Sequence, residues 1–359
     1  MIDAEAFSSL LCDWCLEPQA NQQVLINTTT LALPLVRAMH RALLEREAWP
    51  LLRIAPPWTA QDFYEHASAS HLDGFAPLEL LEAQNVDASL RIDAPADTLA
   101  LANVDPQRIA RAAQARSEVR EARLGHRWCA TLWPTPALAQ QAAMSEHEYD
   151  RFLTRALFLD QPDPAQAWQE LSRRQEQLRE RLTRAQEIRI QADGTDLRLQ
   201  VAGRTWINSD GRRNMPSGEV FTGPHEDSAE GSIRFTVPSS PPGVEVSGVE
   251  LTFEGGKVVS ATATNGHDYL NAAINTDDGA CRIGELGIGT NEGIDRATGS
   301  ILLDEKIAGT VHLALGRSYP ETGARNVSAL HWDLICDLRQ GGCLSADGET
   351  VIEDGRVLQ

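Results

Sequence analysis

The sequence has 359 residues, of which 42% are hydrophobic and 23% charged, values typical of a soluble globular protein with two domains or one large domain. Its apolar runs are short or broken by charged residues, and none approaches the roughly 18 residues that a transmembrane helix requires. The net charge is −19, from 51 acidic and 32 basic residues. This argues against nucleic acid and anionic membranes as partners, because both are bound by basic surfaces.

The start of the chain and its cysteines predict a cytoplasmic protein. Residues 1–18 carry acids where an export signal carries basic residues, so we expect no signal peptide. Without such a signal, the six cysteines of a chain of this length are expected to be reduced. Cys12 and Cys15 form a C-x-x-C pair, but no second pair accompanies it. We therefore interpret it as part of a partly buried helix rather than as a metal or redox site.

The first half of the chain predicts an α/β domain with a mostly parallel sheet. Residues 22–30 and 50–56 have the character of strands, and residues 31–48 between them carry apolar residues at helical spacing. This strand–helix–strand unit is the building block of a parallel sheet. Further strand character follows at 81–94 and 126–134, and further helices are predicted at 105–125, 145–159 and 164–188.

The character of the sequence changes near residue 187. From there, short alternating segments are separated by Asp-Gly, Gly-Gly and Asn-Gly dipeptides, which are typical turns of β-hairpins. One helix is predicted in this part, at 266–276. We therefore expect an N-terminal α/β domain over residues 1–190 and a strand-rich α+β domain over residues 191–359.

Acidic residues and histidines interrupt several apolar, strand-like segments of the second domain. Burying a charged side chain is costly unless it is paired or coordinated to a metal. A single such residue is usually an edge-facing or hydrogen-bonded side chain, but several on separate strands of one domain indicate a common metal site. The residues with this pattern are Glu219, Glu285, Asp304, Glu305, His312, His331 and Asp333.

Strand geometry brings some of these residues together. His331 and Asp333 are two residues apart, so in a strand they point to the same side and can bind one ion. Glu305 and His312, which we place in one strand, are seven residues apart and would need a bend at residues 308–309 to converge. Imidazoles together with carboxylates favour zinc, cobalt, manganese or iron over calcium. Four of these carboxylates and the two imidazoles are too many for one tetrahedral ion, and they suit two ions that share a bridging carboxylate.

Four stretches of the second domain resemble one known family. They are "NMPSGEVFTGPHEDSAEG" at 214–231, "ELGIGTN" at 285–291, "DEKIAGTVHLALGRSYP" at 304–320 and "HWD" at 331–333. Together they resemble the metallo-aminopeptidases typified by aminopeptidase T of thermophilic bacteria. The resemblance extends over the whole second domain and, more loosely, to residues 24–45 of the first. The H-E-x-x-H helix of the commoner zinc peptidases does not occur in the sequence.

The resemblance implies a metal-dependent aminopeptidase that acts on peptides with a free N-terminus and forms a homodimer. It implies two divalent ions, with zinc as the first expectation and cobalt, manganese or magnesium as alternatives. Glu285 corresponds to a bridging carboxylate, and Glu219 or Glu285 would orient the attacking water or accept its proton. Tyr319 would stabilise the tetrahedral intermediate. The implied metal ligands are Glu219, Glu285, Glu305, His312, His331 and Asp333.

Two other functions are open at this stage. A mononuclear-iron ring-cleaving dioxygenase on the same scaffold would keep a histidine and the His-x-Asp pair but needs fewer carboxylates, so Glu219 and Glu285 in their motifs favour the peptidase. A metal-binding protein without catalytic activity would be expected to lack a ligand or Tyr319, and neither is missing. The other histidines are expected at the surface or in packing, and among them His225 stands out because it follows Glu219 by six residues.

Overall fold

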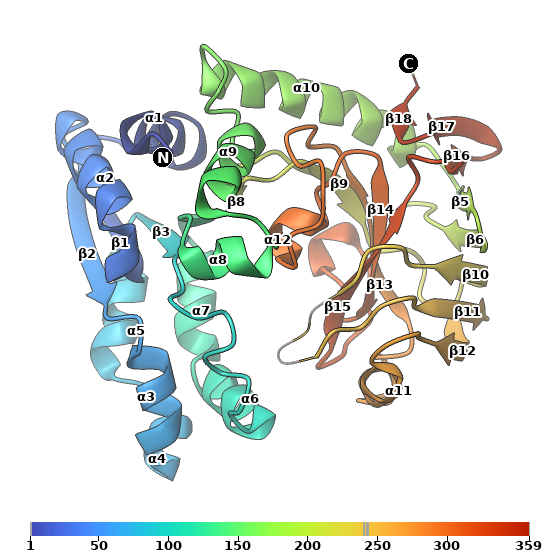
Figure 1. The fold of residues 1–359 in the computed structure, drawn as a ribbon, viewed down its shortest axis with the longest axis horizontal. Helices are drawn as coiled ribbons and strands as arrows, with labels where there is room; N and C mark the ends of the chain where they lie inside the picture. The colour runs from blue at the N-terminus through green and yellow to red at the C-terminus, as the bar shows by residue number, and fades with distance from the viewer. Residues whose placement is uncertain (1, 240, 242–243, 359) are drawn as a thin grey trace. The chain divides into compact units, whose positions relative to one another are not determined.

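The computed structural model describes residues 2–239, 241 and 244–358, and the chain divides into two units (Figure 1). The first comprises Met1–Trp168 and Gly211–Pro216, and the second comprises Gln169–Asp210 and Ser217–Gln359. The change of sequence character near residue 187 falls within the second unit, and the domain division at residue 190 stays a prediction. Within the described residues, no helix has both the length and the apolar character needed to cross a lipid bilayer.

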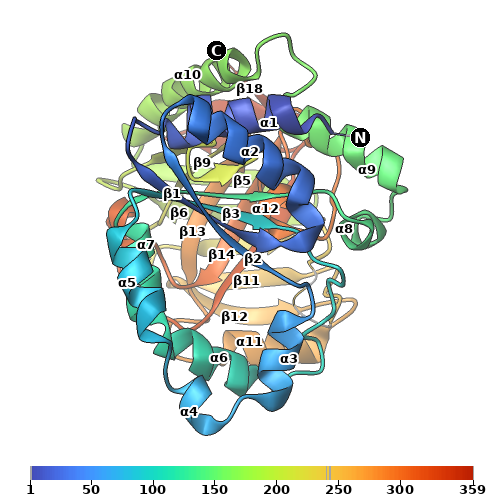
Figure 2. The same ribbon diagram turned by 90° about the vertical axis from the view of Figure 1, so that its left-hand side faces the viewer.

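The first unit is built around a parallel sheet with the strand order β2-β1-β3-β4-β8 (Figure 2). Helix α2 connects β1 to β2, so the predicted strand–helix–strand unit is confirmed. Val24, Leu25 and Ile26 form a continuous buried run in β1, as expected for a parallel strand covered on both faces. The strands are β1 (Gln23–Thr29), β2 (Trp49–Ala55), β3 (Ala88–Asp93), β4 (Arg127–Leu132) and β8 (Asn214–Met215).

The helices of the first unit follow the predicted segments with two differences. The segment 105–125 is interrupted at Arg116, whose backbone leaves the α-helical region, and forms α6 and α7. The segment 81–94 begins as the end of α5, so only its second part is strand. Cys12 and Cys15 are buried in a π-helical turn, consistent with their interpretation as helix. The helices are α1 (Ala4–Leu10), η1 (Leu11–Leu16), η2 (Thr30–Ala32), α2 (Leu33–Glu45), α3 (Thr59–His66), α4 (Ala69–Leu72), α5 (Pro77–Asn85), α6 (Pro106–Ala115), α7 (Ser117–Leu124), α8 (Pro136–Gln141) and α9 (Glu146–Ala156), and α10 (Pro164–Thr183) continues into the second unit.

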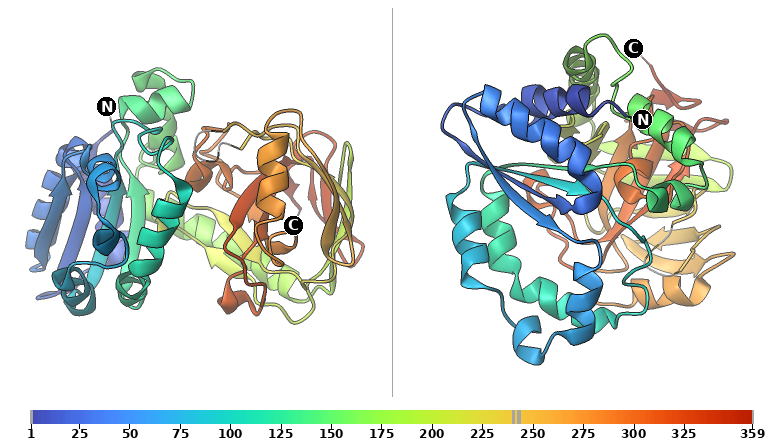
Figure 3. Two further views of the ribbon diagram at one scale, coloured as in Figure 1. Left: turned by 90° about the horizontal axis from the view of Figure 1, so that it is seen from below. Right: turned by 60° about the vertical axis from the view of Figure 1, so that its left-hand side comes forward.

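The second unit contains an eight-stranded and a five-stranded sheet, which are antiparallel (Figure 3). As predicted, an Asp-Gly dipeptide turns the chain between β5 and β6, and a Gly-Gly dipeptide turns it between β11 and β12. The larger sheet has the order β12 (Lys257–Thr262), β11 (Glu250–Glu254), β10 (Glu230–Arg234), β6 (Thr195–Gln200), β5 (Glu187–Ala192), β16 (Cys343–Ala346), β17 (Glu349–Glu353) and β18 (Arg356–Val357).

The five-stranded sheet places one of its faces against the apolar core of the second unit. Val311, Leu313 and Leu315 of β14 all belong to this core, together with residues of the larger sheet, α10 and α11. Because side chains alternate along a strand, His312 points to the opposite face, and that face is buried as well. The sheet has the order β15 (His331–Asp337), β14 (Thr310–Gly316), β13 (Ile283–Gly289), β9 (Glu219–Thr222) and β7 (Ile207–Ser209), and the remaining helices are α11 (His267–Ile274), which was predicted, α12 (Ile301–Asp304) and η3 (Pro320–Thr322).

Candidate metal centre

Five of the predicted ligands share the face of the five-stranded sheet that lies opposite the apolar core. Each is next in sequence to a core residue, such as Val220 beside Glu219 and Leu313 beside His312. Since neighbouring residues of a strand point to opposite faces, the ligands point away from the core together. They come from β9, β13, β14 and β15 and are Glu219, Glu285, His312, His331 and Asp333. We call these five residues and Glu305 the ligand group.

His312 and His331 lie on either side of Glu285. The Nε2 atom of His312 is 3.5 Å from Glu219 Oε2 and 3.7 Å from Glu285 Oε1. The Nε2 atom of His331 is 3.5 Å from Glu285 Oε2 and 3.6 Å from Asp333 Oδ2. Each oxygen of the Glu285 carboxylate therefore faces one imidazole.

Glu305 reaches the ligand group from outside the sheet. The sequence predicts that Glu305 and His312 lie in one strand. This prediction is wrong, because β14 begins only at Thr310. A bend in the expected place is present, where Gly309 has a φ of +83° that favours glycine. As a result, ligand atoms of Glu305, His312 and Asp333 lie within 4.8 Å of one another.

Two other residues singled out in the sequence have their own partners. The buried carboxylate of Asp304 accepts hydrogen bonds from Thr298 N at 2.7 Å and from Gly299 N at 2.8 Å, and burial raises the pKa of this carboxyl to about 6. The Nε2 atom of His225 lies 2.9 Å from the carbonyl oxygen of Ala202. Neither residue belongs to the sets of potential ligand atoms found among the described residues.

Burial dominates the electrostatics of the ligand group. Glu219, Glu285 and Asp333 are only 5%, 5% and 8% exposed, and His312 is fully buried. Loss of solvent is the largest influence on the Glu219 and Asp333 carboxyls, and it raises the pKa of each to about 7. Burial alone would lower the pKa of His312, but the carboxylates of Glu285 and Glu219 outweigh it and raise that pKa to about 9.

Several polar atoms of the ligand group have no hydrogen-bond partner among the described residues. They are Glu219 Oε2, both ring nitrogens of His312 and Asp333 Oδ1. Buried polar atoms are rarely left unpaired, and carboxylate oxygens with imidazole nitrogens are the ligand atoms of zinc and similar ions. The residues therefore fit bound divalent cations. Ligand atoms lie within 4.8 Å of one another in three overlapping sets: Glu219, Glu285 and His312; Glu285, His331 and Asp333; Glu305, His312 and Asp333.

Lys306 is a charged residue of the site that the sequence analysis missed. Its side chain is fully buried, and its ammonium group lies 3.4 Å from Glu219 Oε1 and contacts Glu305 Oε1. A signal was available, because the sequence contains only two lysines and this one directly follows two acids in an otherwise apolar segment. Such a lysine can equally occupy a solvated turn, so its burial could be learned only from the fold.

Tyr319 lies beside the ligand group. Its ring packs edge-on against the ring of His331, with 5.2 Å between the ring centroids, and against Phe221 at 5.6 Å. Burial, followed by the charges of Glu285 and Asp333, raises the pKa of the Tyr319 hydroxyl well above its ordinary value. The hydroxyl therefore keeps its proton at neutral pH and can donate a hydrogen bond.

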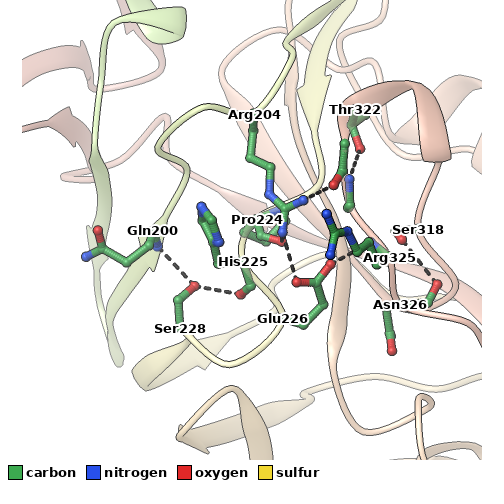
Figure 4. A network of polar contacts seen from close by, with 12 residues as sticks. Gln200, Arg204, Pro224, His225, Glu226, Ser228, Ser318, Thr322, Arg325 and Asn326 are labelled. Carbon is green, nitrogen blue, oxygen red and sulfur yellow. Dashed lines mark hydrogen bonds and ion pairs between the residues drawn. The ribbon is translucent and has the colours of Figure 1, made fainter.

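A partly buried ion pair holds the loop that follows Tyr319 (Figure 4). The side chain of Arg204 is 7% exposed, and its guanidinium donates hydrogen bonds to the Gly323 carbonyl oxygen and, at 2.9 Å, to Glu226 Oε2. Glu226 Oε1 also accepts a hydrogen bond from Arg325 N at 2.5 Å. The loop is thus attached directly to Glu226, in the segment that follows β9, and to Arg204, which is itself paired with Glu226.

A cavity of about 310 Å³ adjoins His331 and Asp333. Its walls combine these two side chains and the polar Ser239 and Asp304 with aromatic and aliphatic ones, a composition usual for sites that bind small molecules. The apolar part of the wall includes Tyr269, Ile301, Leu330, Trp332 and Ile335.

The sequence and the fold both match known proteins. The family model for thermophilic metalloproteases (M29) matches residues 3–357. The chain is 32% identical over 348 residues to aminopeptidase 2 of Geobacillus stearothermophilus, an alignment that covers 85% of this chain and 82% of that protein. It is 32% identical over 254 residues to aminopeptidase T of Thermus aquaticus, covering 63% and 61% of the two chains. The fold matches wild-type AmpT from Thermus thermophilus with a TM-score of 0.84 over 99% of both chains, at 24% identity.

Proposed function

Since the chain belongs to the thermophilic metalloprotease family M29 and is an aminopeptidase, we propose that it removes the N-terminal residue of peptides with the help of two divalent ions bound by the ligand group. One observation carries this proposal. Carboxylate and imidazole atoms converge on one buried face, and several of them have no hydrogen-bond partner among the described residues. The proposed ligands are Glu219, Glu285, Glu305, His312, His331 and Asp333.

The side chains around the centre would share the work of hydrolysis. Divalent ions supply Lewis acidity and lower the pKa of a coordinated water towards neutrality. Glu285, which faces both imidazoles, is proposed as the carboxylate shared between the two ions, and Glu219 or Glu285 orients the attacking water or accepts its proton. The Tyr319 hydroxyl, kept protonated by its surroundings, donates a hydrogen bond to the oxygen on which negative charge develops.

The substrate's free amino terminus would bind one of the ions or a nearby carboxylate, which an acylated terminus could not do in the same way. The acidic chain, with a net charge of −19, also suits a cationic amine. Zinc is the metal proposed first, with cobalt, manganese or magnesium as alternatives, and the homodimer and the cytoplasmic location stay predictions. The iron dioxygenase considered above explains less, because it gives no role to the buried carboxylates of Glu219 and Glu285.

Metal analysis combined with hydrolysis of aminoacyl-p-nitroanilides tests the proposal. We expect about two divalent ions per chain, with activity that a chelator abolishes and added metal restores. An N-acetylated aminoacyl-p-nitroanilide is the matched control and should not be cleaved. One iron per chain without peptidase activity would overturn the proposal.

A further inference from the structure

Lys306 places a permanent positive charge inside the proposed metal centre. It is one of only two lysines in the sequence, and it is fully buried whereas Lys257 is exposed. Its ammonium group lies 3.4 Å from Glu219 Oε1 and contacts Glu305 Oε1, and Asp333 also acts on it through its charge. Since a buried ammonium ion is tolerated only with such partners, the carboxylates and Lys306 depend on one another.

The backbone of Lys306 is fixed by the same residue that supports the turn before Glu219. Asn291 N donates a hydrogen bond to the Lys306 carbonyl oxygen at 3.0 Å. Asn291 Nδ2 donates to the carbonyl oxygen of Ser217 at 2.8 Å. Gly218 packs directly on this asparagine, since a Cβ at Gly218 would lie 2.7 Å from Asn291 Cβ. One residue therefore connects the segments that carry the ammonium and the carboxylate.

Glu219 divides its two oxygens between different partners. Oε1 faces the Lys306 ammonium, whereas Oε2 faces His312 Nε2 at 3.5 Å and has no hydrogen-bond partner among the described residues. A fixed positive charge beside Glu219 and Glu305 has two consequences. It attracts the two carboxylates when no ion is bound, and it repels a divalent ion that approaches them.

We propose that Lys306 is a positioning residue that acts as a built-in cation of the centre, holding Glu219 and Glu305 together without metal and limiting how tightly divalent ions bind. The inference rests on the proposed function, because the same carboxylates are proposed as ligands. In the protonation state that binds metal, in which the carboxylates are ionised and the histidines neutral, the four carboxylates and the ammonium carry a net charge of about −3, which two divalent ions change to about +1. Without the ammonium the loaded centre is neutral, so Coulomb attraction favours tighter metal binding.

The substitution Lys306→Met tests the inference, because methionine is similar in length but uncharged. Two quantities are measured without substrate: the melting temperature of the chelated protein, and the Zn²⁺ affinity by competition with a chromophoric chelator. We expect Lys306→Met to lower the melting temperature of the metal-free protein and to tighten Zn²⁺ binding roughly tenfold or more. The matched control is Lys257→Met, which removes the exposed lysine and should change neither quantity.

A charge-balanced variant keeps the test decisive if Lys306→Met does not fold without metal. In Lys306→Met/Glu305→Gln one positive and one negative charge are removed together, so much of the lost metal-free stability should return. Unchanged or weaker Zn²⁺ binding in the single variant, or no recovery in the double variant, would overturn the inference. Neither measurement uses a peptide substrate. Lack of peptidase activity in the wild-type protein would therefore contradict the proposed function and leave the test of Lys306 unaffected.

Discussion

Gly287 leaves the space that the ring of His312 occupies. The two residues face each other across the β13–β14 pair. A Cβ built on Gly287 would lie 2.1 Å from both Cε1 and Nε2 of His312, whereas ordinary contacts begin at 3.4 Å. The substitution Gly287→Ala therefore requires the ring or the strand to move by about 1.3 Å, the difference between these two distances.

This displacement is large compared with what a metal ligand tolerates. Distances in a metal site are kept within about 0.2 Å, so a ring that moves by more than 1 Å no longer provides the same ligand atom. Misplacement of a catalytic group by about 1 Å costs roughly 10²-fold in rate. Extra volume in a well-packed interior also costs about 1–3 kcal/mol of unfolding free energy. We expect Gly287→Ala to lower kcat/KM by roughly 10²-fold or more, with weaker metal binding and a modest fall in melting temperature.

Steady-state hydrolysis of an aminoacyl-p-nitroanilide, metal content after dialysis and thermal unfolding are measured on the same preparations. The control is Ile288→Val, which alters the next residue of β13 on the face that packs in the apolar core and should cost about 0.5–1.5 kcal/mol. This control should lose stability but keep its metal and most of its activity. Wild-type turnover and metal content in Gly287→Ala would refute the reasoning, and equal losses in both variants would show that strand damage, not the ligand, is responsible.

Three further outcomes are expected from the ligand group and its neighbour. Glu219→Gln should reduce kcat/KM by about 10²–10⁴-fold with little change in fold. The control Glu254→Gln, at an exposed site of β11, should leave kcat/KM unchanged. Near-normal turnover in Glu219→Gln would show that Glu219 does not belong to the site. Tyr319→Phe should lower kcat by about 10²–10³-fold at unchanged metal content, and a parallel loss of metal would mean that the tyrosine instead positions His331. In the metal-free protein the pKa of Glu219 and of Asp333 is raised to about 7, so the stability they contribute is present below about pH 4 and lost as the pH rises through 7. Metal ions bind these carboxylates only when they are deprotonated. The difference in melting temperature between loaded and chelated protein should therefore grow from about pH 5 to pH 8. A difference that stays constant over this range would contradict the assignment of these carboxylates as ligands.

The alternation of side chains explains why much of the ligand face could be predicted. In β15 the polar residues His331 and Asp333 alternate with Trp332 and Leu334, which pack in the apolar core. A slip of one residue would exchange the two sets, so the core fixes the register and with it the direction of the ligands. The period of two is a local property of the sequence, and it indicates a shared face before the partners of the strand are known.

Features that depend on contacts between distant segments were not predictable in this way. The stretch around Lys306 has the apolar character of a strand, yet α12 and a bend at Gly309 occupy its place, because Asp304 accepts backbone hydrogen bonds from the preceding loop. Strand β8 pairs with β4, although the two strands are far apart in the sequence. No local pattern in Asn214 and Met215 indicates that partner. The burial of Lys306 likewise depends on contacts between distant segments, because Asn291 donates hydrogen bonds both to the Lys306 carbonyl oxygen and to that of Ser217, just before β9.

The position of Glu285 shows how one inserted residue can decide the chemistry of a strand. The register between β13 and β14 shifts between Ile283 and Glu285, which marks a β-bulge at Gly284. In an unbroken strand Ile283 and Glu285 would point to the same face, yet Ile283 belongs to the apolar core and Glu285 to the ligand group. Glycine is required at the bulge, since a Cβ on Gly284 would lie 2.3 Å from the carbonyl oxygen of Gly316. Without the bulge this carboxylate would point into the apolar core, where no counter-charge is available, so the bulge is what turns Glu285 towards the two imidazoles.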